Sequence, residues 1–202
     1  LTCMFESAFD PFYTRKEQVQ ESDITFLQRL CKAAGISLKV TAKMIVLFDA
    51  AAYEKKSAVR TIKRGAADVK RYSFNTSFHD ASYSSCHVTY TDPSSGTTYE
   101  ATYKAPDADT SESAQVLEIK EKVSSNAEAK TLAEKRLREK NGQQFTASFT
   151  LVGDAGLVAG VTVTVKGYGA FDGKYIVESA THSVSSSGYT TSVKLRRVLE
   201  GY

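Results

Sequence analysis

The last third of the chain alternates between apolar and polar residues with the period of two that is typical of half-buried β-strands. From Phe145 to Leu151 every second residue is apolar, and the residues between them are Thr and Ser. Residues 161–166 and 192–196 repeat the pattern, with Val or Leu on one side and Thr, Ser, Lys or Arg on the other. One dry and one wet face per strand predict an antiparallel sheet that is solvated on one side.

The stretch from Gly167 to Val198 predicts the longest hairpin. Two runs rich in aromatic and β-branched residues are joined by residues 185–188 (Ser-Ser-Ser-Gly), which is a short turn sequence. Gly167, Gly169 and Gly173 mark its start, where the chain must turn sharply or two backbones must come close. Nothing in the stretch resembles a nucleophile or a ligand set, so we interpret it as a wall of a closely built sheet.

The first 50 residues predict a small α/β module. The expected elements are a strand at 1–7, a turn at Asp10-Pro11-Phe12, a helix from an N-cap at Ser22 to a C′ glycine at Gly35, and a hairpin of 36–40 with 44–48. Apolar residues recur at helical spacing between Ile24 and Ala34, which supports the helix.

The middle of the chain predicts further strands and one amphipathic helix. The expected elements are a strand at 72–78, a hairpin of 85–91 with 97–103, an exposed acidic loop at 105–113, and a strand at 116–119. Ser125 and Glu128 form a capping box, and the helix that they start runs to about Lys140. The sequence therefore predicts an α+β fold. Residues 51–202 form a mainly antiparallel β-barrel with one packed helix, and residues 1–50 precede it as the helix-plus-hairpin module.

Composition narrows the class of protein only slightly. The chain has 202 residues, of which 42% are hydrophobic and 24% charged, and its formal net charge is +3. This is the composition of a soluble globular chain, and no apolar run approaches the roughly 20 residues of a membrane-spanning helix. Cys3, Cys31 and Cys86 are odd in number and widely spaced, so we expect free thiols in a reducing cytosol. Because the first residue is Leu1, we expect the sequence to be a fragment.

Residues 55–71 contain seven Lys and Arg side chains that are nearly unopposed by acids. One interpretation is an electrostatic patch for nucleic acid. The other is a solvated connector followed by an edge strand, whose lysines discourage pairing with other chains. We favour the second interpretation because aromatic residues are sparse in this run.

We expect no catalytic, cofactor-binding or metal-ligating residue. The histidines stand in no metal-binding spacing; they are His79, His87 and His182. Cys86 and His87 are adjacent in a predicted strand, so their side chains should point to opposite faces and form no thiolate–imidazole pair by themselves. Residues 153–160 are Gly-rich but lack the Lys-Ser/Thr ending of a phosphate-binding loop, and Asp172-Gly173 is first of all a turn.

Residues 21–35 read Glu-Ser-Asp-Ile-Thr-Phe-Leu-Gln-Arg-Leu-Cys-Lys-Ala-Ala-Gly. This run resembles the Glu-Ser-Asp-(apolar)-x-Phe-Leu-x-x-Leu-(four variable)-Gly signature of the phage late control D proteins, which are baseplate hub proteins of contractile tails. Residues 38–48, 83–90 and 169–197 also look like parts of this family, so the resemblance covers nearly the whole chain.

The resemblance implies a structural role. Hub proteins of this kind form a homotrimer in which each subunit contributes two similar barrel domains, so that a pseudo-sixfold ring meets the tail tube or its initiator protein. The other end carries the membrane-puncturing spike, and the spike–hub proteins of type VI secretion share this plan. A first barrel would normally precede the α/β module, and we expect it to be absent from this sequence. The implied location is the tail baseplate of a virion that is assembled in the bacterial cytoplasm.

We therefore expect a non-enzymatic baseplate hub subunit that joins the tail tube to the spike in a contractile phage tail or a related injection system. It would need no cofactor, no membrane insertion and no specific nucleic acid. The alternatives are a tail-associated cell-wall hydrolase and a basic nucleic-acid-binding barrel. In a hub, a Ser/Thr face could line a wet lumen; the candidates are Thr146, Ser148, Thr150, Thr162 and Thr164. Burial of these side chains in the core would contradict this.

Overall fold

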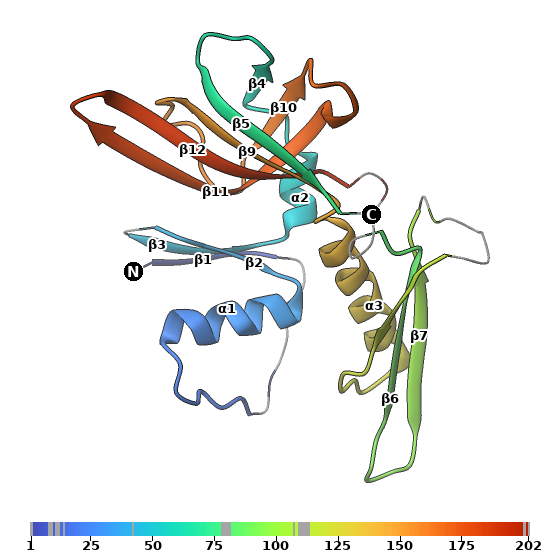
Figure 1. Cartoon of the computed structure of the whole chain (residues 1–202). Coiled ribbons are helices and arrows are strands. Elements are labelled where there is room, and N and C mark those ends of the chain that lie inside the picture. The colour runs from blue at the N-terminus through green and yellow to red at the C-terminus, as the bar shows by residue number, and fades with distance from the viewer. Residues whose placement is uncertain are drawn as a thin grey trace.

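The computed structural model of the chain describes residues 2–7, 10, 13, 15–41, 43–77, 82–106, 108, 114–199 and 201. These residues form three separate β-sheets, three α-helices and one short 3-10 helix (Figure 1). Some expectations from the sequence lie outside the described residues: Pro11 and Phe12 of the first turn, Phe78, His79, and most of the acidic loop at 105–113. Within the described part of the chain, no helix has the length and apolar character needed to cross a membrane.

The first sheet contains, in spatial order, β1 (Thr2–Glu6), β3 (Met44–Phe48) and β2 (Ser37–Val40). β2 and β3 pair antiparallel as the predicted hairpin, whereas β1 runs parallel to β3. Helix α1 (Asp23–Ala34) covers one face of this sheet (Figure 1), and the small core between them contains Cys31, Ala34 and Ile36.

Both ends of α1 follow the prediction. The Oγ atom of Ser22 accepts a hydrogen bond from the amide of Thr25 at 3.3 Å. Gly35 ends the helix with a φ of 66°, a conformation that strains residues with a side chain. A Cβ atom at Gly35 would also lie 2.6 Å from Cδ of Lys135. Glycine is therefore needed here for the left-handed turn.

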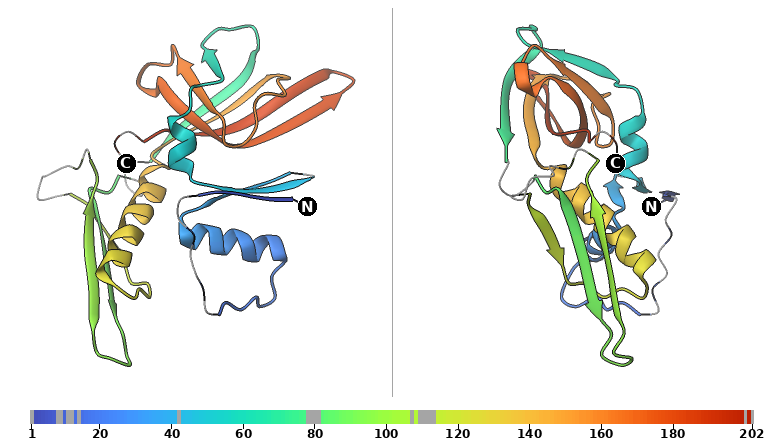
Figure 2. Two further views of the ribbon diagram at one scale, coloured as in Figure 1. Left: turned by 180° about the vertical axis from the view of Figure 1, so that it is seen from behind. Right: turned by 90° about the vertical axis from the view of Figure 1, so that its right-hand side faces the viewer.

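The largest sheet has six strands in the order β4 (Arg60–Lys63), β10 (Thr162–Lys166), β11 (Gly173–Ser185), β12 (Gly188–Arg197), β9 (Phe145–Val152) and β5 (Val69–Thr76). It curls into a half-barrel, as the two views of Figure 2 show. The apolar positions predicted from alternation face its core, where Phe149, Leu151, Val163 and Leu195 are buried. β11 and β12 form the predicted long hairpin.

The α+β class is confirmed, but the mainly antiparallel barrel is not. The six-stranded sheet is open, with β4 and β5 at its edges, and β4 runs parallel to β10. Alternation shows which face of a strand is buried but not the direction of its neighbour, so it could not reveal the parallel pair. Aromatic rings fill the space beside the β5 edge: Phe74 stacks on Phe171 of η1 (Gly169–Phe171), with ring centroids 4.7 Å apart.

The third sheet contains β7 (Thr98–Lys104), β6 (Ser85–Thr91) and β8 (Val116–Ile119), in that order. Helix α3 (Asn126–Asn141) begins with the predicted cap, in which Oγ of Ser125 accepts a hydrogen bond from the amide of Glu128 at 3.1 Å. It packs on this third sheet, where Ala129, Ala133 and Leu137 meet Cys86. The expectation that the helix would pack on the barrel is therefore wrong, because an apolar stripe shows that a helix has a partner but not which one.

Helix α2 (Ala50–Lys55) links the first sheet to β4 (Figure 1). It lies where three packing units come together: the first sheet with α1, the half-barrel, and the third sheet with α3 (Figure 1). It is short and follows β3 almost directly. The aromatic ring of its Tyr53 packs against Phe48 of β3, with centroids 4.3 Å apart. Because of this position, α2 is a useful reference for describing how the three packing units are arranged.

Candidate functional site

Cys86 and His87 point to opposite faces of β6, as predicted. Cys86 is fully buried beneath α3, and this burial, together with the nearby Glu118 carboxylate, raises the pKa of its thiol to about 11. His87 lies on the other face, where Nδ1 is 3.0 Å from Oγ1 of Thr102. The thiol is thus held away from the imidazole. Among the described residues, no three His, Cys, Asp or Glu side chains are grouped so that they could hold a metal ion.

Asp172 stabilises a tight turn, as the sequence indicated. Its carboxylate accepts hydrogen bonds from the amide of Gly167 at 2.9 Å and the amide of Tyr168 at 2.6 Å. These bonds stabilise the charged form and hold the pKa of Asp172 below its ordinary value. A general acid at neutral pH needs the opposite shift, so this carboxylate is suited to shaping the backbone and not to donating a proton.

The basic run at 55–71 is better compensated than its sequence indicated. Arg60 forms ion pairs with Asp68 and, at 2.7 Å, with Asp154. The Arg60 guanidinium also holds the pKa of Asp154 below its usual range. The amino group of Lys56 lies 3.5 Å from the centroid of the Tyr53 ring. The run supplies β4 and the start of β5, both sheet edges, as the connector-plus-edge-strand interpretation predicted.

Small hydroxyl side chains form rows across the outer face of the half-barrel. Ser73 of β5 and Ser148 of β9 share a hydrogen bond at 2.8 Å. Thr150 of β9 and Ser192 of β12 lie 3.3 Å apart in the next row. The rows follow the registered strand pairs, so they cross the sheet from one strand to the next. The same rows carry long basic side chains, since Lys194 is registered beside Ser148 and Arg71 beside Thr150.

Four of the five residues expected on a wet face lie outside the core: Ser148 is exposed, and Thr146, Thr150 and Thr164 are partly buried. The fifth prediction, Thr162, is wrong. Thr162 is only 1% exposed, and its Oγ1 donates a hydrogen bond to the carbonyl of Lys56 at 3.0 Å. The segment that follows α2 passes over the start of β10 and covers this residue.

A buried carboxylate on α2 joins the three packing units. Glu54 is 3% exposed. Its Oε2 accepts a hydrogen bond from Nη2 of Arg138 on α3, and its Oε1 accepts one from Nη2 of Arg196 on β12 at 2.5 Å. A buried charge is tolerated only when it is paired and hydrogen-bonded, and here two guanidinium groups, one from helix α3 and one from strand β12, provide this.

The main chain around Glu54 is fixed as well. Nζ of Lys174 on β11 donates to the carbonyl oxygens of Glu54 and Lys56, each at 2.6 Å. These carbonyls lie at the C-terminal end of α2, where a positive charge is favourable. Nε of Arg196 additionally lies 3.5 Å from Oε1 of Glu178. We refer to Glu54, Arg138, Arg196 and Lys174 as the Glu54 junction.

Sequence reasoning missed the Glu54 junction. Arg138 follows Glu54 by 84 residues and Arg196 follows it by 142, so no local spacing links them. The only signal was one acid within a short, Ala-rich segment at the start of a basic run. Such a residue is normally interpreted as exposed, because Glu is rarely buried without a partner that the sequence reveals.

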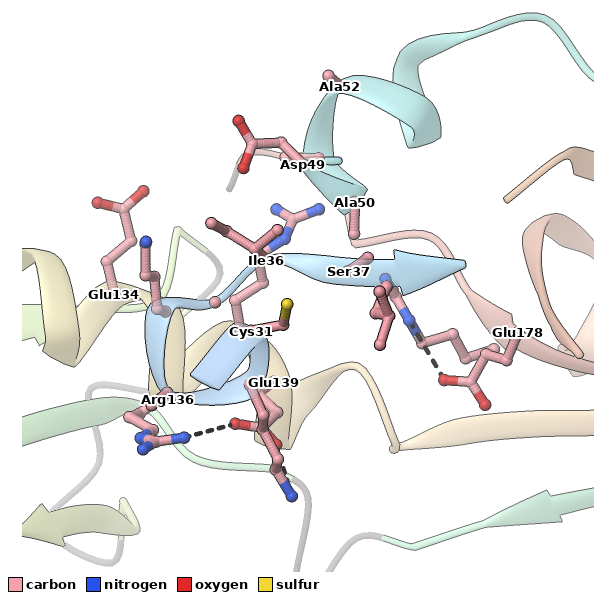
Figure 3. Close-up of a pocket in the computed structure, with 18 of the residues that line it drawn as sticks. Cys31, Ile36, Ser37, Asp49, Ala50, Ala52, Glu134, Arg136, Glu139 and Glu178 are labelled. Carbon is pink, nitrogen blue, oxygen red and sulfur yellow. Dashed lines mark hydrogen bonds and ion pairs between the residues drawn. The ribbon is translucent and has the colours of Figure 1, made fainter. Parts of the chain in front are cut away.

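A cleft of about 930 Å³ opens beside the junction, between the end of α1, α2 and α3 (Figure 3). Its wall carries both charge signs, including the ion pair of Arg136 with Glu139 at 3.0 Å and the carboxylate of Glu178. Lys135 bridges it by donating to the carbonyl of Ala34, and burial lowers the pKa of this lysine. Several of its charged groups are ion-paired, and we interpret the cleft as a space between packed sheets and helices.

Three comparisons with known proteins bear on these features. The model of one protein family, described as phage tail baseplate hub (GPD), matches residues 4–188. A search of the curated proteins finds no significant match. A tail protein from Neisseria meningitidis superimposes with a TM-score of 0.71 at 16% identity and covers 97% of this chain. A prophage tail protein from Shewanella oneidensis gives a TM-score of 0.69 at 17% identity and covers 98%.

A component of the type VI secretion system from E. coli, described as structurally similar to bacteriophage tail proteins, gives a TM-score of 0.50 at 14% identity over 100% of this chain. The chain spans 61% of the Neisseria protein, 59% of the Shewanella protein and 44% of the E. coli protein. At these identities the likeness shows a common fold.

Proposed function

The chain belongs to the phage tail baseplate hub family, and from that premise we propose that it is a structural subunit joining the tail tube to the membrane-puncturing spike. The system would be a contractile phage tail or a related injection apparatus. The observation that carries the proposal is the family match over residues 4–188, which includes parts of all three sheets. The structural neighbours, which are two tail proteins and a type VI secretion component, agree with this proposal.

The Glu54 junction supports a structural role. A part placed between a tube and a spike must keep its units in a fixed relative orientation. Ion pairs from α3 and β12 meet at one buried carboxylate on α2. They restrict movement of the units relative to one another, because breaking them would leave buried charges without a partner. No enzymatic step is needed for this role, and we propose that the protein is not an enzyme.

We further propose that the full-length protein forms a homotrimeric ring and that the outer hydroxyl face of the half-barrel lines its lumen. The candidates for this face are Thr146, Ser148, Thr150 and Thr164. Short hydroxyl side chains interact well with water and offer little adhesion to a passing polymer. The proposed division of the chain is a module at 1–50 and a hub region at 51–202, the latter containing the half-barrel and the third sheet. The proposed location is the virion baseplate, after assembly in the bacterial cytoplasm.

Light scattering and electron microscopy of the full-length protein test this proposal. We expect the mass of a trimer, a ring in projection, and the ring at the spike end of isolated tails. A protein that stays monomeric at high concentration and never forms rings would contradict it. Release of soluble fragments from purified cell wall by the protein would favour the hydrolase alternative instead.

A further inference from the structure

A second concave surface lies beside strand β8 of the third sheet. It is a groove of about 540 Å³, which we call the β8 groove. Leu117 and Ile119 of β8 line one side of it, and Arg136, Glu139 and Lys140 of α3 line the other. The ion pair of Arg136 with Glu139 also borders the larger cleft, so the two hollows adjoin (Figure 3). The β8 groove thus lies between the edge of a sheet and a helix.

Strand β8 is open on the side away from β6. It pairs with β6, and the described residues supply no strand on its other side. An edge of this kind presents backbone donors and acceptors to which a further strand can bind. β8 has only four residues, however, and a short edge limits such pairing. A strand bound here would therefore need side-chain contacts in addition to backbone hydrogen bonds.

The β8 groove lies where those side chains would point. Leu117 and Ile119 pack against the core between α3 and the third sheet, and both are only partly buried. Because side chains alternate along a strand, every second residue of a strand beside β8 would enter the groove. An apolar side chain there would cover Leu117 and Ile119. A residue on the opposite face would lie beside Val116, which is 48% exposed. Apolar burial on both faces would add to the few backbone hydrogen bonds.

The charges of the groove favour an acidic residue in the bound strand. Arg136 pairs with Glu121 at 2.8 Å and with Glu139 at 3.0 Å. Lys32 of α1 also reaches Glu139, at 3.2 Å. Both carboxylates of the groove are therefore compensated. Lys140, by contrast, is exposed and has no ion-pair partner among the described residues. The groove thus combines an apolar side with one uncompensated positive charge.

We propose that the β8 groove binds an extended segment of a partner protein, which adds a strand to the open edge of β8. The segment carries an apolar residue and an acidic residue two positions apart. The apolar residue packs on Leu117 and Ile119, and the acidic residue meets Lys140. In recognition by strand addition, main-chain hydrogen bonds give affinity and pockets for alternate side chains give specificity. This inference does not depend on the position proposed above between tube and spike.

An extended segment fits this surface better than a helix. The backbone groups of a helix are already paired with one another, so a bound helix would leave the open side of β8 without hydrogen-bonding partners other than water. A strand pairs with these groups and also directs side chains into the groove.

Two fluorescent peptides test the chemistry of the bound segment. The probe is Thr-Val-Thr-Glu-Thr-Val-Thr, in which Val and Glu lie on one face, and the control peptide has Lys in place of Glu. We expect fluorescence anisotropy to show that the 202-residue chain binds the Glu peptide about fivefold more tightly, the scale of an exposed ion pair turned into a repulsion. Equal affinities would overturn the role of Lys140. A lack of binding by either peptide at millimolar concentration would overturn the site.

A charge reversal on α3 tests the position of the acidic residue. Lys140→Glu should weaken binding of the Glu peptide and strengthen binding of the Lys peptide. Lys130→Glu is the matched control, because this lysine is also exposed on α3 but does not line the groove. It should leave both affinities unchanged. Equal effects of the two variants would contradict the proposal, since net charge alone would then explain the binding. Unchanged melting temperatures would show that both variants fold.

Hydrogen exchange tests the strand addition itself. We expect the bound Glu peptide to slow amide exchange within β8, at residues 116–119. Strand β7, the other edge of the same sheet, is the internal control and should exchange at its usual rate. Protection of β7 in place of β8 would overturn the assignment of the edge. Binding without any protection of β8 would show that the peptide contacts side chains only, which would overturn the added strand.

Discussion

The carboxylate of Glu54 meets the guanidinium of Arg196 at 2.5 Å, although 142 residues separate the two in the chain. Their side chains are 2% and 13% exposed. Glu54 stands on the helix that leaves the first sheet, and Arg196 lies near the end of the last strand of the half-barrel. This ion pair therefore joins α2 to the last strand of the half-barrel, and Arg138 on the same carboxylate adds the helix that packs on the third sheet.

Replacing Glu54 by Ala should destabilise the protein strongly. The change removes the buried carboxylate that pairs with both Arg138 and Arg196, and leaves Arg196 only the more distant Glu178 carboxylate. Breaking a buried pair in this way costs about 3–5 kcal/mol. Equilibrium unfolding in urea would measure the loss. Glu100→Ala, at an exposed position on β7, is the matched control and should change stability by less than about 0.5 kcal/mol. Similar stabilities for the two variants would show that the ion pairs contribute little.

Gly153 should not tolerate a side chain. A Cβ atom built on it would lie 1.9 Å from Cδ1 of Tyr189, which belongs to the long hairpin. We expect Gly153→Ala to lower stability by about 1–3 kcal/mol, the usual effect of an overpacked contact. Tyr189→Ala removes the ring that causes the clash, so in the double variant Gly153→Ala should cost much less. A double-mutant cycle measures this coupling. Additive effects would mean that the ring is not the cause.

The elements that the sequence predicted correctly depend on local chemistry. The hydroxyl cap of Ser22, the left-handed glycine at Gly35 and the capping box at Ser125 each involve residues within a few positions of one another. Alternation between Phe145 and Leu151 assigned the buried face correctly because a strand has a period of two. The hairpin turn before Gly188 followed from turn-forming residues between two β-rich runs.

What the sequence could not predict depends on contacts between distant residues. Thr162 has the same alternating pattern as Thr164 but is covered by a segment that begins more than 100 residues earlier. The parallel partner of β10 is β4, about 100 positions away, and nothing in the two strands records their relative direction. The same limit applies to Glu54, whose burial is a consequence of two arginines that only the folded chain brings to it.

The charge of Asp154 should make the stability of the folded protein depend on pH in the acid range. Arg60 and the amide of Gly156 lower the pKa of Asp154 in the folded state. A lowered pKa contributes stability above the unfolded value of about 3.9, and this contribution is lost as the pH falls through the folded value.

We therefore expect wild type to melt about 2 °C above Asp154→Asn at pH 6, the scale of a partly exposed ion pair, and this difference to vanish as the pH falls below 3.9 toward the folded value. Differential scanning fluorimetry across this range would measure it. Glu100→Gln should run parallel to wild type at every pH. A constant gap between wild type and Asp154→Asn would exclude a role for the Asp154 charge.

The three thiols should differ sharply in reactivity. Cys3 is exposed on the edge strand β1, whereas Cys31 and Cys86 are buried. Burial raises the pKa of both buried thiols, that of Cys86 to about 11, so at pH 8 only about one Cys86 in a thousand would be the reactive thiolate.

A chromogenic disulfide reagent should therefore titrate one thiol per chain rapidly, and the other two only as fast as the protein opens. Cys3→Ser should abolish the fast phase, and concentrated guanidinium chloride should make all remaining thiols react at once. A second fast thiol in native protein would mean that the core around α1 or α3 opens readily, which would contradict the rigid arrangement proposed for a hub.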